Sequence, residues 1–326
     1  MYFLACLGAF LVTSVCIFLL RPLSLRLNLV DTPNHRKRHA GRVPLIGGVA
    51  MFLGFSAVLL TLPISLYAYR SFITGLSLLV FVGLLDDLRE LSAKSRLCAQ
   101  IIAILLMFFW GDIKLIYLGT LFFHGAIFLG PVASLVITLV AGLGLINAIN
   151  LIDGMDGLAG TVVLVQLILL VICAQLSQQF VVIPFLCLLI AVLMAFLLFN
   201  FRWRSGIQAY LFMGDSGSMF LGFALLWFLI ELSQHSPAPI VTPVTMLWVM
   251  SLPLFDTAAV MLQRLIQKRS IFTSDRNHIH YLLAEYQYSP RQISISLGLF
   301  NFILGGAAIL AFYYQISESI LFFCLC

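Results

Sequence analysis

Charged side chains are scarce in this sequence. Asp, Glu, Lys and Arg together make up 10% of its 326 residues, while hydrophobic residues make up 62%. A soluble protein has about 25% charged residues and is about half apolar. Because the mean hydropathy is also high, at +1.09, the composition excludes an ordinary soluble domain and predicts a polytopic membrane protein.

Cysteines are too scattered to build a structural site. The seven cysteines lie in apolar segments and lack the spacing of a zinc site or of a disulfide framework. We interpret them as small core or lipid-facing residues. The sequence also lacks low-complexity tracts and any convincing internal repeat.

Long hydrophobic runs dominate instead. A membrane-spanning helix needs about 20 apolar residues, and about ten segments meet that condition. We therefore expect an all-α fold that forms a single integral-membrane domain over residues 1–326, with an active site built from cytoplasmic loops and helix ends. Residues 111–130 predict a non-spanning hairpin on one face, and residues 320–326 are too few to span. The predicted spans are residues 2–20, 45–65, 71–85, 97–110, 131–149, 158–176, 179–199, 217–233, 243–265 and 292–314.

Positive charges lie on one side of these predicted spans. The first segment has no basic region before it, and Arg21 and Arg26 follow it. We therefore expect an uncleaved anchor with its N-terminus outside. With alternation from there, 16 of the 18 Lys and Arg residues fall in inner loops, whereas Arg70 and Lys114 fall outside. The positive-inside rule thus predicts that the inner loops face the cytoplasm.

The most informative stretch is residues 147–160, between two predicted spans. It contains Asn147, Asn150, Asp153 and Asp156 together with three glycines. Carboxylates near membrane depth are costly and usually mark a substrate or ion site. Glycines allow the backbone to approach a ligand closely. The alternative interpretation is a glycine-rich turn whose acids face water.

Two other acidic motifs lie on the same predicted face. Asp86 and Asp87 end a hydrophobic run, and adjacent carboxylates repel each other unless a cation is near. The alternative is a solvated helix end with Lys94 and Arg96 as counter-charges. Asp215 stands among small residues just before a predicted helix, a position that suits a phosphate or a metal. Its alternative is an ordinary N-cap.

Histidines and basic residues occupy two further inner loops. Residues 275–280 include His278 and His280, which we expect to contact an anion rather than a transition metal. Residues 34–39 include Arg38 and indicate either a substrate contact or an anchor attracted to anionic lipid. Taken together, the inner loops carry carboxylates, cations, amides and histidines, a mixture that suits Mg²⁺ and phosphates.

In this order the motifs resemble those of one family, the polyprenyl-phosphate N-acetylhexosamine-1-phosphate transferases (the superfamily of MraY and WecA). The likeness covers nearly the whole chain. The loop that holds His278 and His280 is similar to that of the WecA branch, whose donor is UDP-N-acetylglucosamine. The motifs that carry the resemblance are residues 31–34, 36–39, 44–48, 86–87, 147–160, 212–218, 253–256 and 274–280.

The resemblance implies a reaction at the inner leaflet of the bacterial inner membrane. The phosphate of undecaprenyl phosphate attacks the sugar-side phosphorus of UDP-N-acetylglucosamine, UMP leaves, and undecaprenyl-diphospho-N-acetylglucosamine remains. Such a step starts a lipid-linked surface glycan, such as O-antigen of lipopolysaccharide or common antigen. Mg²⁺ is the implied cofactor, and Mn²⁺ is a substitute. Membrane lipid is an implied partner, nucleic acid is not, and the resemblance also suggests a homodimer.

The resemblance further implies roles for single residues. The lipid phosphate is already anionic, so we expect direct attack with little proton chemistry. The residues themselves leave open whether an aspartate acts as a base, a nucleophile or a metal support. The implied catalytic residues are Asp86, Asp87, Asp153 and Asp156. The implied metal ligands are Asp215, Asn150 and Asp153. The implied substrate-binding residues are Arg38, Lys94, Arg96, Asn147, Asn150, Asp156, Arg264, His278 and His280, with Lys94 and Arg96 as alternatives for one diphosphate contact.

Two features depart from the family pattern. Tyr281 stands where members of the WecA branch usually have another histidine. This change leaves open a different UDP-N-acetylamino sugar as the donor. Relatives also often continue into an eleventh helix and a basic tail beyond the position of Cys326, which we expect to be peripheral.

A membrane transporter is the competing hypothesis from a different class. Its ion sites would be intramembrane acids, reachable from both sides of the membrane near its midplane. Asp256 is the one carboxylate that we place within a predicted span, with Arg264 two helical turns after it. Because the other acids gather on one face and no inverted repeat is evident, the sequence favours the enzyme.

Overall fold

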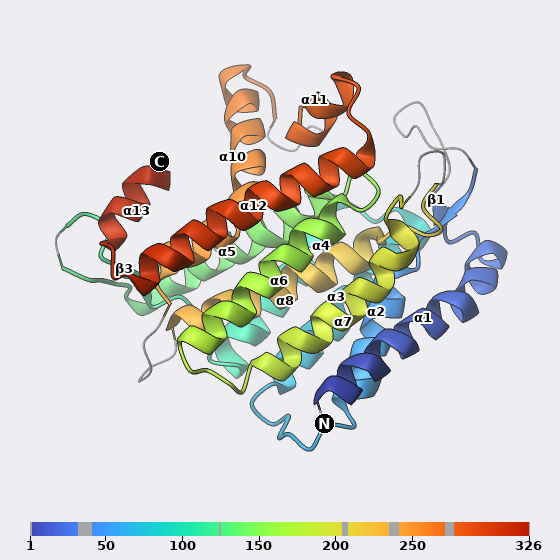
Figure 1. Ribbon diagram of the computed structural model, residues 1–326, viewed down its shortest axis with the longest axis horizontal. Coiled ribbons are helices and arrows are strands. Elements are labelled where there is room, and N and C mark those ends of the chain that lie inside the picture. Colours follow the sequence, from blue (N-terminus) through green and yellow to red (C-terminus); the bar gives the residue numbers. More distant parts are fainter. Residues whose placement is uncertain are drawn as a thin grey trace.

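The computed structural model describes residues 2–31, 41–123, 125–203, 208–234, 241–270 and 277–325. Helices make up nearly all of the regular structure (Figure 1), as the predicted all-α fold requires. The helices are α1 (Tyr2–Arg26), α2 (Gly47–Leu59), α3 (Arg70–Arg89), α4 (Ala93–Leu105), α5 (Pro131–Ile152), α6 (Leu158–Leu176), α7 (Ile183–Asn200), α8 (Gly214–Gln234), α9 (Pro243–Val249), α10 (Ser251–Ile266), α11 (Ile279–Glu285), α12 (Pro290–Tyr313) and α13 (Glu318–Leu325). A π-helical turn, η1 (Leu106–Trp110), extends α4, and the short strands are β1 (Val30–Asp31), β2 (Val43–Pro44), β3 (Tyr117–Gly119) and β4 (Ile127–Phe128).

The described residues contain eight helices that are long and apolar enough to cross a membrane, or nine if α9 and α10 count as one span. Two of the predicted spans differ from the structure. The span predicted over 45–65 contains only α2, whose 13 residues make a helix of about 20 Å, shorter than the ~30 Å hydrocarbon core. The span predicted over 243–265 is broken, because α9 and α10 meet at a bend of 80°.

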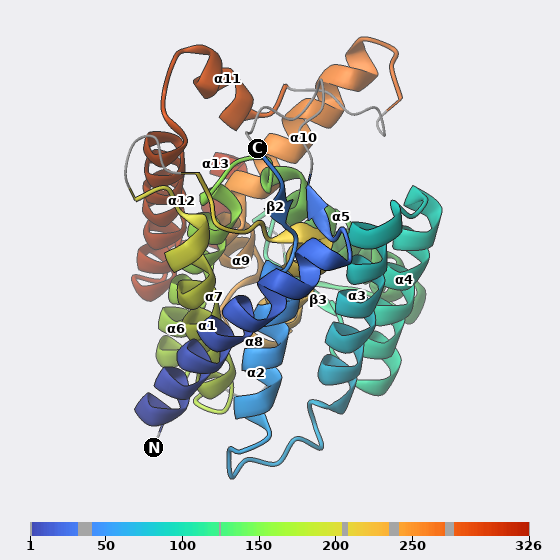
Figure 2. The same ribbon diagram turned by 90° about the vertical axis from the view of Figure 1, so that its right-hand side faces the viewer.

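Asn301 of α12 stabilises this break between α9 and α10. Its side-chain amide donates to the carbonyl oxygen of Val249 at 3.2 Å and accepts from the amide of Leu252 at 3.3 Å. The two interrupted backbone groups are therefore satisfied by a fully buried side chain. The bend carries α10 beyond the end of the bundle, where α11 also lies (Figure 1, Figure 2). Asp256, placed within a span by the sequence, belongs to this projecting helix.

The non-spanning hairpin predicted over residues 111–130 is confirmed. Strands β3 and β4 pair antiparallel within it. Gln234, at the last turn of α8, bonds to both backbone groups of Tyr117. Glu318 of α13 accepts a hydrogen bond from the amide of Thr120 at 2.7 Å. The last apolar residues thus form a short helix that holds the hairpin and is too short to span, as the sequence predicts.

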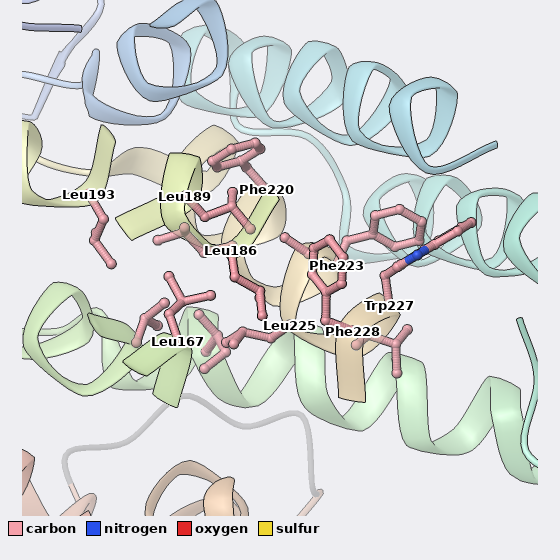
Figure 3. Packing of buried hydrophobic residues seen from close by; sticks show 14 of the residues in the cluster. Leu167, Leu186, Leu189, Leu193, Phe220, Phe223, Leu225, Trp227 and Phe228 are labelled. Atoms are coloured by element: carbon pink, nitrogen blue, oxygen red, sulfur yellow. The ribbon is translucent and has the colours of Figure 1, made fainter. Parts of the chain in front are cut away.

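Helix α8 lies at the centre of the bundle. It packs against α2, α3, α5, α6 and α9. Within its apolar stretch, 94% of the residues are buried inside the protein. Figure 3 shows Phe220, Phe223 and Trp227 of α8 next to leucines of α6 and α7, among them Leu167 and Leu186. Because α8 is buried along its length, its first residues are held rigidly at the end of the bundle where α10 and α11 project.

Glycines allow the neighbouring helices to approach the start of α8. A Cβ added at Gly48 of α2 would lie 2.1 Å from the amide nitrogen of Gly217, and one at Gly83 of α3 would lie 2.5 Å from the backbone of Ser216. Backbone hydrogen bonds add to this contact, since Gly48 donates to the carbonyl oxygen of Met213 at 2.9 Å. The residues before α2 and before α8 therefore form one connected unit.

We predict that Gly48→Ala destabilises the protein, because its methyl group would overlap the backbone of α8. The expected cost is at least about 1–3 kcal/mol, the usual range for overpacking a core. Gly144→Ala in α5 is the matched control, since a Cβ there meets nothing within 4 Å. Thermal unfolding of both variants in detergent measures the difference, and equal unfolding temperatures would contradict the packing argument.

Candidate active site

Asp87 joins the end of α3 to the start of α8. Its two carboxylate oxygens accept hydrogen bonds from the backbone amides of Asp215 at 2.8 Å and Ser216 at 3.2 Å. A carboxylate is favoured there, because helix N-termini have free N–H groups and a partial positive charge. Gly214 has a φ of 74°, and a Cβ on it would lie 2.6 Å from Asp87. Asp87 thus occupies the two backbone amides that the sequence pattern offers to a phosphate.

Asp215 is held by Asn150 from α5. The side-chain amide of Asn150 donates to Asp215 Oδ1 at 2.5 Å and to the hydroxyl of Ser218 at 2.8 Å. The Asp215 side chain remains 28% exposed. Three elements far apart in the sequence, α3, α5 and α8, therefore present Asp87, Asn150 and Asp215 in one place, as the motif analysis predicts.

Asp86 and Arg96 complete this group of residues. Asp86 is buried, and its Oδ1 accepts a hydrogen bond from the amide of Leu91 at 2.6 Å. Its Oδ2 lies 3.3 Å from a guanidinium nitrogen of Arg96, and the same nitrogen lies 3.8 Å from Asp215. Lys94 is exposed two residues earlier on α4. Of the two alternatives left by the sequence, Arg96 is the one that reaches the carboxylates.

Asp153 lies next to these acids, directly after α5. Burial raises the pKa of its carboxyl well above the ordinary value, and the charges of Asp215, Asp156 and Asp87 raise it further. Carboxylates gathered in this way repel one another, so the site favours a cation. In the described part of the chain, no three acidic, histidine or cysteine side chains are arranged as ligands of one metal ion. Mg²⁺ usually needs only one or two protein carboxylates, with water and phosphate as its other ligands, so the residues fit it.

Asp156 has a different partner. Its Oδ2 accepts a hydrogen bond from Arg202 Nε at 2.5 Å, and the Asp156 side chain is only 10% exposed. Its backbone carbonyl accepts from Ser294 at 3.3 Å. Arg202 is a residue to which the sequence analysis gives no role, because it counts only as a basic residue of an inner loop. The ion pair joins the loop after α5 to the loop after α7.

Asn147 is held away from the carboxylates. Its side-chain nitrogen donates to Gln100 Oε1 at 2.8 Å and to the carbonyl oxygen of Leu143 at 2.7 Å. Gln100 is buried on α4, one turn after Arg96. This contact, which the sequence analysis missed, fixes α4 against α5. The predicted substrate role of Asn147 stays a prediction.

The histidine loop forms a second group of residues around Asp256. Asp256 bonds to His278 and to the backbone of α11, and the rings of His278 and His280 stack 5.8 Å apart. His280 is fully buried, and neither ring nitrogen has a hydrogen-bond partner among the described residues. A Cβ on Gly154 would lie 2.5 Å from His280 Nε2, so the loop packs on the backbone beside Asp153.

The remaining predicted residues fall outside these two groups. Arg264 is buried on α10, and the predicted grip of this residue on diphosphate stays a prediction. Arg38, with the rest of the basic run over 34–39, lies outside the described residues. The first two positions of the histidine loop, 275 and 276, also lie outside them.

Comparisons with known proteins support the family resemblance. A family profile described as "Glycosyl transferase family 4" matches residues 69–233, which include α3 to α8. Proteins named "Undecaprenyl-phosphate alpha-N-acetylglucosaminyl 1-phosphate transferase" are similar over most of the chain. The Yersinia pestis protein is 35% identical over 313 residues, which are 96% of this chain and 83% of that protein. The Haemophilus influenzae protein is 33% identical over 320 residues, which are 98% of this chain and 88% of that protein. The Escherichia coli (strain K12) protein is 33% identical over 307 residues, which are 94% of this chain and 83% of that protein.

We predict that His280 stays neutral at pH values well below the usual pKa of histidine. Burial lowers its pKa to about 4, the charge of His278 acts in the same direction, and Asp256 opposes both. A histidine in the unfolded chain has a pKa of about 6.5. As pH falls from about 6.5 toward 4, the unfolded chain therefore binds the proton first, and the buried position of His280 loses stability. Above that range its contribution to stability does not change with pH.

Nitrogen NMR of histidine-labelled protein measures this titration directly. His280→Gln identifies the signal of His280 by removing it. A midpoint near 4 is expected, and a midpoint at or above 6.5 would contradict the buried, neutral ring.

Proposed function

The chain belongs to glycosyl transferase family 4, and we propose that it transfers N-acetylglucosamine-1-phosphate from UDP-N-acetylglucosamine to undecaprenyl phosphate. An oxygen of the lipid phosphate forms a bond to the sugar-side phosphorus, the bond between the two phosphates of the donor breaks, and UMP leaves. The product is undecaprenyl-diphospho-N-acetylglucosamine, the start of a lipid-linked surface glycan. The observation that carries the proposal is the group of Asp86, Asp87, Arg96, Asn150 and Asp215 at one end of a membrane bundle.

Mg²⁺ is the cofactor that these residues fit, with Mn²⁺ as a substitute. Asp215, Asp153 and the amide oxygen of Asn150 are the proposed ligands. When bound, the ion would supply positive charge that neutralises these carboxylates and the phosphates of the donor. Asp87 acts one step away by fixing the backbone that carries Asp215. Burial and the charges of neighbouring carboxylates raise the pKa of Asp153, and a cation beside it would favour the ionised form that binds a metal.

Arg96 is the proposed clamp for the reacting phosphates. Its guanidinium lies between Asp86 and Asp215, and the Arg96 side chain is 34% exposed, so it is both oriented and accessible. The transfer brings two anions together, and fixed positive charge lowers the cost of that approach. The lipid phosphate needs no general base for its attack, so Asp86 acts by holding Arg96 in place. We place this site at the cytoplasmic face of the bacterial inner membrane, as the distribution of basic residues predicts.

A second candidate keeps the reaction and changes the sugar. The ring of Tyr281 packs against His280 at a tilt of 43°, with ring centroids 4.2 Å apart, and its hydroxyl would lie 2.8 Å from a Cβ on Gly154. A phenol in this position offers a different hydrogen-bonding surface from that of a second imidazole. This observation favours testing other UDP-N-acetylamino sugars as donors.

Release of UMP by purified protein tests the reaction. We expect release from UDP-N-acetylglucosamine that depends on undecaprenyl phosphate and on Mg²⁺ and that stops with EDTA. Asp215→Asn should lower the rate by at least ~10²-fold, because it removes a charged ligand at the reacting phosphates. Release of UMP only with a different donor would show that another UDP-amino sugar is the substrate. No release with any UDP-amino sugar, from folded protein, would contradict the enzyme assignment.

Arg96→Gln and Lys94→Gln distinguish the two basic residues of α4. We expect Arg96→Gln to lower kcat/KM by about 10²–10³-fold, as for the loss of one electrostatic donor at a transition state. Lys94→Gln removes an equal charge from the same helix at an exposed position and should change kcat/KM by less than about threefold, since exposed charges are screened. Equal losses in both variants would show that the effect is general attraction of anions rather than a clamp.

A further inference from the structure

Asp256 lies where helix α10 meets the histidine loop. The 80° bend after α9 carries α10 out of the bundle at the same end at which α11 lies (Figure 2). The Asp256 side chain is only 7% exposed, and its partner His278 is only 4% exposed. A carboxylate buried this far is held there by specific partners, and neither the motif analysis nor the comparisons give it a role.

Both carboxylate oxygens of Asp256 bind the start of α11. Oδ1 accepts a hydrogen bond from the backbone amide of Ile279 at 2.8 Å, and Oδ2 lies 2.8 Å from His278 Nδ1. His278 is the N-cap residue of α11, but its own side chain forms no capping hydrogen bond. Asp256 therefore supplies the cap from another helix. A helix of seven residues needs such a contact, because isolated helices this short are not stable.

The contact also determines which nitrogen of His278 has the proton. An ionised carboxylate only accepts hydrogen bonds, so Nδ1 is the donor and Nε2 of the neutral ring is left as the acceptor. The oriented ring stacks on His280, which packs on Gly154 beside Asp153. A continuous series of contacts thus runs from Asp256 to the loop that holds Asp153, one of the proposed metal ligands.

We propose that Asp256 is a positioning residue for donor binding. It holds α11 against the active site and keeps His278 in the tautomer with the proton on Nδ1, so that Nε2 is available to the substrate. The proposal rests on the proposed function for its kinetic part only. The tautomer and the capping contact are properties of the protein itself.

Asp256→Asn tests the proposal, because the amide keeps nearly the same shape. Its oxygen can still accept from Ile279, but its nitrogen must donate to His278 Nδ1, which moves the ring proton to Nε2. Nitrogen NMR of histidine-labelled protein should show His278 protonated at Nδ1 in the original protein and at Nε2 in the variant. We expect kcat/KM for UDP-N-acetylglucosamine to fall about 10–100-fold, as for other residues that orient a functional histidine.

Glu285→Gln is the matched control, since it removes a charge from an exposed position of the same helix and should leave both the tautomer and kcat/KM unchanged. An Nε2–H tautomer in the original protein would overturn the proposal even if the variant did not fold. A kcat/KM within twofold of the original value in folded Asp256→Asn would overturn its kinetic part. Original protein that is inactive with every donor would instead contradict the proposed function and leave the tautomer measurement valid.

Discussion

The hydrogen bonds from the start of α8 to Asp87 are the interaction on which the site depends. They join α3 to α8 at the backbone of Asp215, the residue proposed as a metal ligand. Glycines at positions 48 and 83 bring the backbones of α2 and α3 close enough for this contact to form. Because α8 is buried along its length, the geometry at its first turn is set by the packing of the whole bundle.

This arrangement concentrates negative charge where the membrane protein has little other charge. Asp86, Asp87, Asp153 and Asp215 gather at one end of the bundle, and Arg96 is the cation that lies within reach of two of them. Such a group is costly without further positive charge. A divalent cation satisfies that need and also attracts phosphates, so the electrostatic requirement of the fold and the chemistry proposed for it coincide.

The histidine loop and Asp256, the second group of residues in the site, lie outside the bundle. The break between α9 and α10 carries α10 out of the end of the bundle at which α11 lies (Figure 2), and Asp256 connects the two helices. His280 rests on the backbone at Gly154. The part of the chain that matches the family profile, residues 69–233, ends before α10 and α11. The proposed catalytic carboxylates and the histidine loop are thus separate structural units that meet at the loop after α5.

Local chemistry in the sequence determined the all-α membrane class, the hairpin over 111–130, the face on which the charges gather, and the motifs that form the site. These properties depend on hydropathy and charge along short stretches of chain, which do not change when helices pack. Only the tertiary structure decided the partners: Arg96 rather than Lys94 near Asp215, Arg202 for Asp156, Gln100 for Asn147, and Asp256 for His278. It also decided the break in the span predicted over 243–265. Each of these depends on distances between helices far apart in the sequence, which no local pattern contains.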